Sequence, residues 1–194
     1  MSELTKIITK LIISEGDINF YNNHISLVVK HAIALARIEN EDEEAIELAA
    51  LLHDIGRIRH GGEKHNLKGE KIAREILKQH NYDPMKTEQI CNAIISHDGT
   101  KEFPVKDVFG KIIRSADGLS HLDIVPLLLT LEIQKKNGDV GKSVKRLIEK
   151  LNFEWDNKIT LKSARRIGKA KYESAILVLK SKLDVLNQVG QNVK

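Results

Sequence analysis

Apolar residues recur along most of the chain at intervals of three and four positions, the spacing that puts them on one face of an α-helix. No segment shows a convincing alternation of apolar and polar residues, which is the pattern of a half-buried strand. The sequence therefore predicts an all-α fold, a single-domain helical bundle of eight or nine helices. The expected helices cover residues 2–14, 19–39, 41–56, 66–80, 84–97, 104–117, 120–136, 142–152 and 160–188.

The three prolines refine these boundaries. Asp83 directly before Pro84 is typical of an N-cap followed by the first helical turn, and Pro104 precedes another apolar-periodic run, so helices are expected to begin near 83 and 104. Pro126 is expected to begin or kink a third helix. The most irregular connection predicted is 57–65, which is glycine-rich and basic and directly follows a His-Asp doublet.

The composition is that of an ordinary globular domain, with 41% hydrophobic and 30% charged residues among 194. No apolar run approaches the ~20 residues that span a bilayer, and Lys6 and Lys10 interrupt the apolar pattern near the N-terminus. We therefore expect no membrane partner and no signal peptide, and a cytoplasmic location. The single cysteine, Cys91, lies among helical apolar residues, which favours a packed core thiol over a nucleophile.

The formal net charge is +4, and the surplus is concentrated towards the C-terminus. Residues 142–182 hold twelve Lys or Arg against four acids, including a stripe of Lys162, Arg165, Arg166 and Lys169. Two interpretations stay open for this segment: solvated helical faces, or attraction to the phosphates of a nucleotide or a nucleic acid.

Histidines or a carboxylate fall on the apolar face of four predicted helices, at His24 or His31, His53, His97 and Asp117. Burying polar groups is unfavourable unless each finds a partner, and a divalent cation would satisfy them all. Mixed nitrogen and oxygen ligands suit Mn, Fe, Co, Ni or Zn, with Mg less favoured. His24 and His31 are roughly 10 Å apart along a helix, so one ion cannot bind both, and spacing alone does not choose between them.

The doublet His53–Asp54 comes at the end of an apolar helical run, before Gly56. Adjacent helical side chains point about 100° apart, but both can reach one ion that lies off the end of the helix. Gly56 is expected to loosen the backbone there, next to the connection 57–65. The ion is then expected at the helix tip, beside the loop through which a substrate would enter.

Five segments together resemble the HD-domain superfamily of metal-dependent phosphohydrolases. They read HISLV (24–28), LLHDIGR (51–57), HNLKGEKIAREIL (65–77), ICNAIISHDG (90–99) and RSADGLSHLD (114–123). The bare His-Asp dipeptide occurs twice and says little, whereas the ordered set of segments is specific. The resemblance covers about residues 20–130, which would form an HD core. The C-terminal helices at about 142–188 would pack on this core, so that residues 1–194 make a single domain.

The resemblance implies a site as well as a fold. It prefers His24 over His31 because HISLV matches the family's first-histidine motif, which leaves His31 a supporting role. Two-metal members recruit further histidines, so His65 and His97 are candidates either for a second ion or for contact with a substrate phosphate. The metal ligands implied are His24, His53, Asp54 and Asp117.

The chain also departs from the family pattern in the segment around Asp117. Many relatives carry a basic residue at the position of Gly118 and an acid at the position of Ser115. The lysine often found after the doublet is Arg57 here, which keeps the charge and adds a fork suited to phosphate. The absence of a cation at 118 leaves phosphate recognition, and hence the substrate, open.

The function implied is hydrolysis at phosphorus of a nucleotide or another small phosphate ester, by water that a bound divalent cation activates. Asp54 would be both a metal ligand and the catalytic residue that orients the water, while Arg57, Lys64, His65 and His97 would contact substrate phosphates. One alternative is a module that senses a nucleotide without turnover, and another is a nucleic-acid-binding helical protein. An apolar face of the last helix leaves a homo-oligomer open.

Overall fold

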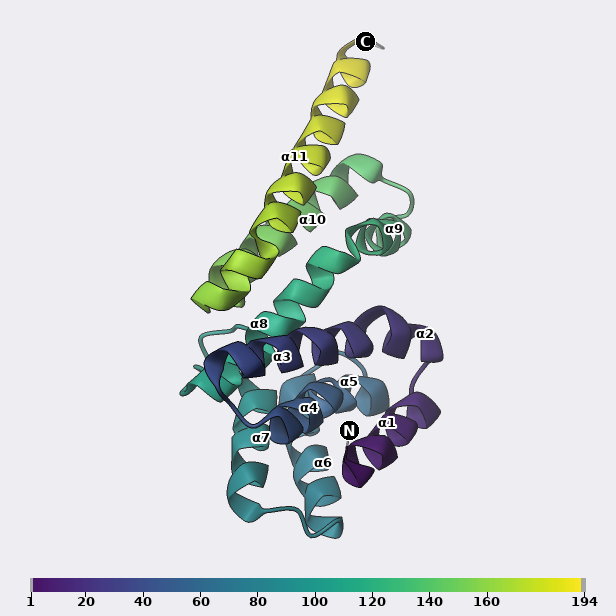
Figure 1. The fold of residues 1–194 in the computed structure, drawn as a ribbon. Coiled ribbons are helices and arrows are strands. Elements are labelled where there is room, and N and C mark those ends of the chain that lie inside the picture. Colours follow the sequence, from purple (N-terminus) through teal and green to yellow (C-terminus); the bar gives the residue numbers. More distant parts are fainter. Residues whose placement is uncertain (1, 193–194) are drawn as a thin grey trace.

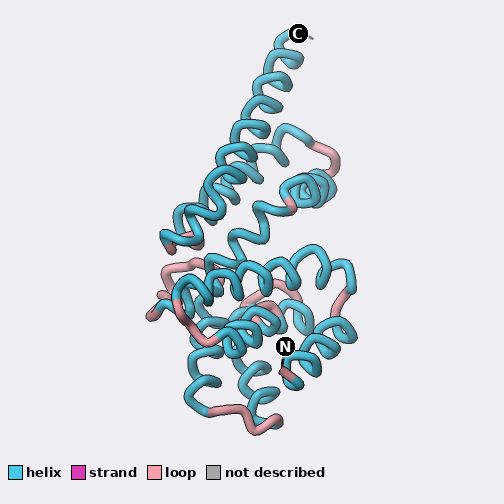
Figure 2. Tube along the Cα trace, in the orientation of Figure 1, coloured by secondary structure: helices cyan, strands magenta, loops and turns pink. Residues whose placement is uncertain are grey.

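The computed structural model describes residues 2–192, and every regular element within them is a helix (Figure 1 and Figure 2). Nine of the helices have ten or more residues, so the prediction of an all-α fold with eight or nine helices is confirmed. In chain order the elements are α1 (Glu3–Glu15), α2 (Ile18–Phe20), the π-helical segment η1 (Tyr21–Ile25), α3 (Ser26–Glu39), α4 (Glu43–Leu52), α5 (Ile55–His60), α6 (His65–Gln79), α7 (Pro84–Ser96), α8 (Val108–Asp123), α9 (Val125–Lys135), α10 (Val140–Asn157) and α11 (Lys162–Asn192).

Helices α3 and α8 run through the middle of the molecule and pack against each other (Figure 1). Helices α1 and α4–α7 lie on one side of α3, and α9–α11 lie on the other. Helix α8 passes from the first group to the second, where α10 and α11 pack on it and on each other. The C-terminal helices predicted at 142–188 are therefore in contact with the rest of the bundle through α8.

The core is aliphatic, as the scarcity of aromatic residues at 4% requires. Among the described side chains, Phe109 is the only aromatic one of the largest that are fully buried, and isoleucines and leucines such as Leu35, Ile46 and Ile90 make up the rest. Burying one such side chain stabilises the fold by roughly 1.5–3 kcal/mol. Fully buried alanines on α3 and α4, including Ala32 and Ala49, let these two helices pack closely.

Aspartates begin several helices as N-caps, because their carboxylates accept backbone N–H groups that have no partner inside the helix. Asp83 caps α7 with Pro84 in the first turn, as predicted. The start predicted at Pro104 is wrong: α8 begins at Val108, because Asp107 Oδ1 accepts the Gly110 N–H at 2.8 Å. Pro126 lies in the first turn of α9, as expected.

The helix predicted over 41–56 is interrupted at the His-Asp doublet. α4 ends at Leu52, and Asp54 has φ −106° and ψ 13° and begins α5. The connection 57–65 is correspondingly shorter than predicted, because α5 continues to His60. A separate break predicted between 117 and 120 is also absent, since α8 continues through Gly118 to Asp123.

Gly56 has a different role from the one expected, because it brings α5 and α6 together. A Cβ atom at Gly56 would lie 2.0 Å from the carbonyl oxygen of His65 and 2.5 Å from the backbone nitrogen of Gly69. Only a glycine permits this backbone contact. The contact carries the start of α6, and hence His65, towards the His-Asp doublet.

Candidate metal centre

Six side chains converge from five elements on one buried point between α3, α4, α6, α7 and α8. Most come from helix ends. His24 lies in η1, where the π-helical geometry changes the direction in which the chain's side chains project. His53 follows the last residue of α4, and His97 that of α7. The complete set is His24, His53, Asp54, His65, His97 and Asp117.

Backbone carbonyls fix the protonation pattern of three of the histidines. The Nδ1 atoms of His53, His97 and His65 lie 2.7, 2.6 and 3.1 Å from the carbonyl oxygens of Ala50, Ile94 and Gly62. A carbonyl oxygen can only accept, so each Nδ1 must carry the proton and donate it. Each neutral ring therefore presents an unprotonated Nε2 lone pair to the centre, the arrangement usual for metal-ligating histidines.

Ser120 fixes His24 in the same way. The Ser120 hydroxyl donates to the backbone carbonyl oxygen of Asp117 at 2.7 Å, so its hydrogen is already used. Its oxygen, 3.2 Å from His24 Nδ1, must therefore accept the ring N–H. His24 Nε2 is consequently also a lone pair, and it points at His53 and Asp54.

The four lone pairs face one another at short range. His24 Nε2 lies 3.2 Å from His53 Nε2, and His65 Nε2 lies 3.1 Å from His97 Nε2. All four rings carry their proton on Nδ1, so the two Nε2 atoms of each pair have no proton to share. Each Nε2–Nε2 contact is therefore between two acceptors. A cation between the nitrogens would convert both contacts into bonds, and the residues present thus fit a divalent metal.

Asp54 divides the ligand atoms into two groups. Its Oδ2 lies 3.5 Å from His24 Nε2 and 3.8 Å from His53 Nε2. Its Oδ1 lies 3.4 Å from His65 Nε2 and 3.8 Å from His97 Nε2. Asp117 Oδ1 joins the first group, 3.5 Å from His24 Nε2. Within each set of three, His24–His53–Asp54 and Asp54–His65–His97, the ligand atoms lie within 4.8 Å of one another.

Electrostatics keep the site in its metal-binding protonation state. Burial alone would raise the pKa of Asp54, but neighbouring positive charge, including that of Arg57, holds it well below its ordinary value. Lys158 and neighbouring histidines do the same for the pKa of Asp117 against its burial. Burial lowers the pKa of His97 to about 3. The carboxylates are thus anionic and the His97 ring neutral, as ligands must be.

Two basic side chains pair with these carboxylates without enclosing them. Arg57 Nε donates to both Asp54 oxygens at 3.1 and 3.0 Å, and Lys158 Nζ donates to Asp117 Oδ2 at 2.5 Å. The Oδ1 atom of Asp117 stays directed at His24. Neither carboxylate is therefore satisfied by basic groups alone, and both belong to the histidine cluster.

An open pocket of about 500 Å³ lies over the centre. Its floor includes His24, Asp54 and Asp117, and Phe20 forms part of its wall, with the ring centroid 5.2 Å from that of His24. Leucines of α9 form an apolar wall, and lysines of α9 and α10 add positive charge. These further lining residues are Leu127, Leu128, Leu131, Lys135, Lys150 and Lys158.

Residues 21–122, just over half of the chain, match the family described as HD domain. The chain belongs to the HD domain family. Its fold is similar to the crystal structure of a predicted HD superfamily hydrolase from an uncultured Thermotogales bacterium, with a TM-score of 0.65 and 21% identity over 93% of this chain and 92% of that one. At this identity the likeness concerns the fold alone.

A second relative is named tRNA (cytidine(56)-2'-O)-methyltransferase and comes from Picrophilus torridus. It is 31% identical over 156 residues, which are 72% of this chain and 43% of that protein. The chain thus spans less than half the length of this relative, and the activity in that name belongs to the longer protein. Separately, none of the helices within residues 2–192 is both long and apolar enough for a membrane span.

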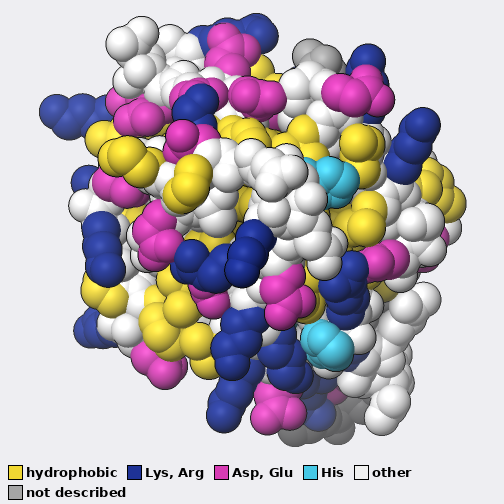
Figure 3. Space-filling view, turned by 90° about the horizontal axis from the view of Figure 1, so that it is seen from below, with side chains coloured by type: hydrophobic (Ala, Val, Ile, Leu, Met, Phe, Trp, Pro, Cys, Tyr) yellow, Lys and Arg dark blue, Asp and Glu magenta, His cyan; other side chains and the backbone are white. Residues whose placement is uncertain are grey.

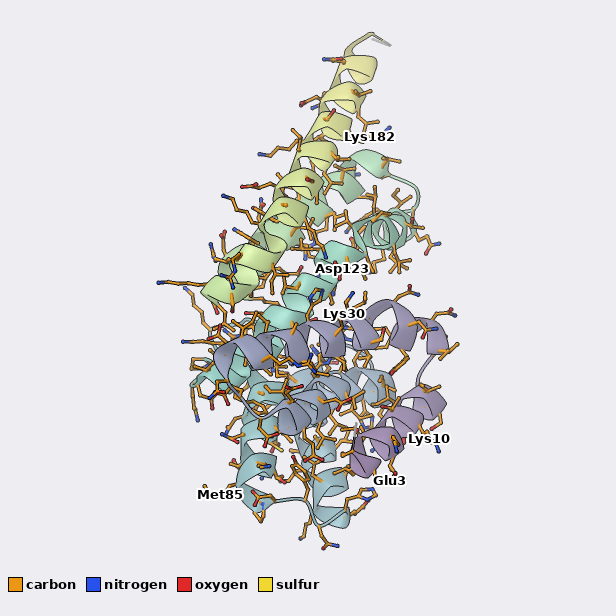
Figure 4. All side chains as sticks on the ribbon, viewed as in Figure 1. Glu3, Lys10, Lys30, Met85, Asp123 and Lys182 are labelled. Carbon is orange, nitrogen blue, oxygen red and sulfur yellow. The ribbon has the colours of Figure 1, made fainter. Side chains whose placement is uncertain are left out.

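Two candidates from the sequence, His31 and Lys64, lie outside the cluster of six ligand side chains. His31 Nε2 pairs with Asp123 Oδ2 at 2.7 Å and so ties α3 to the end of α8, where Asp123 is labelled in Figure 4. The structure therefore resolves the choice that spacing left open, since His24 and not His31 lies at the centre. Lys64 is exposed in a left-handed conformation and does not line the pocket.

The sequence interpretation gave His121 only a weak claim and missed Lys158, and both lie beside the cluster of ligand side chains. His121 stacks on His24 with centroids 5.1 Å apart and lines the pocket, and its place four residues after Asp117 on α8 was the available signal. Lys158 comes from the end of α10, and no local pattern relates it to Asp117. Cys91 is buried and burial raises its pKa to about 12, in keeping with the expected core thiol.

Proposed function

We propose that this HD domain protein is a metal-dependent phosphohydrolase acting on a nucleotide or another small phosphate ester. The observation that carries the proposal is the convergence of four imidazole lone pairs and two carboxylates, which share no protons, at the base of an open pocket. Such a ligand set suits a divalent cation with nitrogen and oxygen preference, among Mn, Fe, Co, Ni and Zn, with Mg less favoured.

Two groups of residues would each hold a divalent ion, and Asp54 belongs to both groups. His24, His53 and Asp117 would complete the first site, and His65 and His97 would complete the second, because the two Asp54 oxygens face these groups separately. When bound, the ions supply an activated water and withdraw charge from the phosphoryl oxygens. Asp54 would be a ligand in both groups and would orient the attacking water.

Arg57 would bind the substrate's phosphoryl group. Its side chain is 44% exposed, lines the pocket and donates to Asp54, so a phosphoryl group bound at the pocket floor would lie within its reach. A guanidinium fork matches two phosphoryl oxygens and neutralises charge that develops on them. Its NH2 atom is 3.2 Å from His65 Nε2, so Arg57 would turn towards the phosphate when that nitrogen binds a metal.

The pocket walls support a substrate larger than phosphate alone. Phe20 and the α9 leucines form an apolar surface next to the charged floor, and 500 Å³ is within the usual range for small-molecule sites. A phosphate at the floor and a flat, partly apolar ring system against Phe20 would use both parts. This favours a nucleotide within the wider class of phosphate esters.

Phosphate release from a panel of nucleoside mono-, di- and triphosphates with Mn²⁺, Co²⁺ or Mg²⁺ tests the proposal. Wild type is expected to hydrolyse at least one, and Asp54→Asn to lose about 10³-fold in turnover while keeping its helical circular dichroism. Asp184→Asn, an exposed carboxyl on α11, serves as the control with wild-type turnover. Metal binding without any turnover would instead support a nucleotide sensor and overturn the enzymatic proposal.

A role on RNA is the second candidate, and the named tRNA methyltransferase relative is the observation that favours it. The basic stripe offers limited support: Arg165 donates to the carbonyl oxygens of Ile159 and Trp155, which leaves Lys162, Arg166 and Lys169 exposed. The face seen in Figure 3 intersperses Lys and Arg with Asp and Glu. Steeply salt-dependent tRNA binding that Arg166→Gln weakens and Asp54→Asn does not would establish this function.

A further inference from the structure

Lys158 is a buried cation at the wall of the pocket, and it comes from outside the segment that matches the HD family. It is the C-cap residue of α10 and is only 8% exposed. Its Nζ donates to Asp117 Oδ2, and the residue lines the pocket together with Arg57. The family match ends at residue 122, so the HD core alone does not contain this group.

Backbone contacts hold the segment Lys158–Ile159 in place. The N–H groups of both residues donate to the carbonyl oxygen of Glu154, at 2.8 and 2.9 Å. Ser115 Oγ donates to the Lys158 carbonyl oxygen at 3.1 Å, and Arg165 Nε donates to the Ile159 carbonyl oxygen at 2.9 Å. Three helices, α8, α10 and α11, therefore fix where Lys158 enters the pocket.

Helix α8 is shaped to receive this segment. A Cβ atom at Gly118 would lie 2.8 Å from Ile159 Cγ1 and 3.3 Å from Lys158 Cβ, so a side chain at 118 would displace the segment. Ser115 and Gly118 are thus small because Lys158 and Ile159 lie against them. The sequence has no basic residue directly after Asp117, but Lys158 brings a positive charge to this carboxylate from the end of α10.

We propose that Lys158 binds a phosphoryl oxygen of the substrate, an inference that rests on the proposed phosphohydrolase function. An ammonium has three donors, and Asp117 Oδ2 takes one of them at 2.5 Å. Asp117 Oδ1 is directed at His24, so Lys158 and a metal would use different oxygens of one carboxylate. The remaining donors of Lys158 are then available to an anion in the pocket that Arg57 also lines.

Lys158 is buried beside the Asp117 carboxylate, to which its ammonium donates. A buried charge with one close partner is unfavourable unless its other donors find acceptors. A substrate phosphate bound in the pocket over the metal centre would be such an acceptor.

The competing role for Lys158 is purely structural, as the partner that orients Asp117. Inorganic phosphate separates the two roles when its binding is measured by titration calorimetry at saturating Mn²⁺. The variants are Lys158→Met, Lys158→Gln as a second neutral form in case the first does not fold, and Lys142→Met. Lys142 lies on the same helix, is 76% exposed and does not line the pocket, so its variant controls for net charge.

At saturating Mn²⁺, Lys158→Met or Lys158→Gln is expected to bind phosphate about tenfold more weakly than wild type and than Lys142→Met. Mn²⁺ affinity is expected to be retained or to increase, because a positive charge next to the ion has been removed. The inference is overturned if both neutral variants bind phosphate with wild-type affinity. It is also overturned if their phosphate affinity falls only because they no longer bind Mn²⁺. Wild type that binds Mn²⁺ but no phosphate overturns the inference alone, whereas wild type that binds no metal overturns the proposed function as well.

Discussion

The Nε2 atoms of His24 and His53 lie 3.2 Å apart although the residues are 29 positions apart in the chain, and neither nitrogen carries a proton. The hydrogen bonds of the two Nδ1 atoms, to Ser120 and to the Ala50 carbonyl, establish this protonation. Two acceptors at this distance repel each other. The folded chain therefore holds the site in a geometry that a cation stabilises, and the following predictions depend on that property.

Divalent metal is expected to stabilise the protein against heat. A ligand that binds only the folded state adds about 2.7 kcal/mol at a concentration of 100 Kd. For a chain of this size this corresponds to a rise in Tm of roughly 5–10 °C. Differential scanning calorimetry of chelator-treated protein with and without Mn²⁺ measures the shift. Asp54→Asn should lose most of it, and an equal shift in that variant would place the bound metal elsewhere.

Ser120→Ala is expected to weaken metal binding although Ser120 would not touch the ion. Its hydroxyl accepts the His24 Nδ1–H, so its loss frees the ring to turn and to change tautomer. Mn²⁺ affinity should fall by about 10–100-fold, the usual effect of losing such a supporting hydrogen bond. Ser14→Ala, at an exposed position on α1, is the matched control. Equal affinities in both variants would contradict the role given to Ser120.

The stability of chelator-treated protein is expected to decrease in mild acid. Burial lowers the pKa of His97 to about 3, from an ordinary value of 6.5. Between these two values the unfolded chain binds a proton that the folded chain does not. The free energy of unfolding should therefore fall by about 1.4 kcal/mol per pH unit as the pH drops below 6.5, with no contribution from His97 above it.

Urea unfolding at pH 5, 6, 7 and 8 measures this dependence. Burial also lowers the pKa of His53 and His65, which act with the same sign. His97→Gln should reduce the slope below pH ~6.5 because one of these groups is removed. An unchanged slope in that variant would show that His97 titrates normally in the folded protein.

Gly118→Ala is expected to destabilise the protein, against the usual sign of this change. Alanine in a helix is normally favoured over glycine by about 1 kcal/mol. Here the added Cβ would lie 2.8 Å from Ile159 Cγ1, so a loss of about 1–3 kcal/mol in the free energy of unfolding is expected. Gly141→Ala is the matched control, because its nearest contact is Asp139 Oδ1 at 3.6 Å. Chemical denaturation should show a loss only at 118.

Helical periodicity predicted the nine longer helices because their apolar faces are what the bundle buries. Boundaries were less accurate where two signals competed. Pro104 marked a helix start, but the Asp107 carboxylate caps the chain three residues later. A break was expected between residues 117 and 120, yet α8 continues through Gly118, against which Ile159 packs.

Apolar helix faces pointed to His24 or His31, His53, His97 and Asp117, and the resemblance to the HD-domain superfamily chose His24 and added Asp54 and His65. The structure brings His24, His53, Asp54, His65, His97 and Asp117 together. Lys158 could not be found because its position depends on how α10 and α11 pack against α8, which no local pattern encodes. Likewise, the leucines of α9 look like ordinary amphipathic positions until the fold places them over the pocket.

A metal centre built around Asp54 can be detected as the metal content of the purified chain after loading with Mn²⁺ and desalting. About two ions per chain are expected in wild type, about one in His65→Ala, and none in Asp54→Asn, with the helical fold kept in all three. Wild-type protein without bound metal, or Asp54→Asn with as much metal as wild type, would contradict a centre built around Asp54.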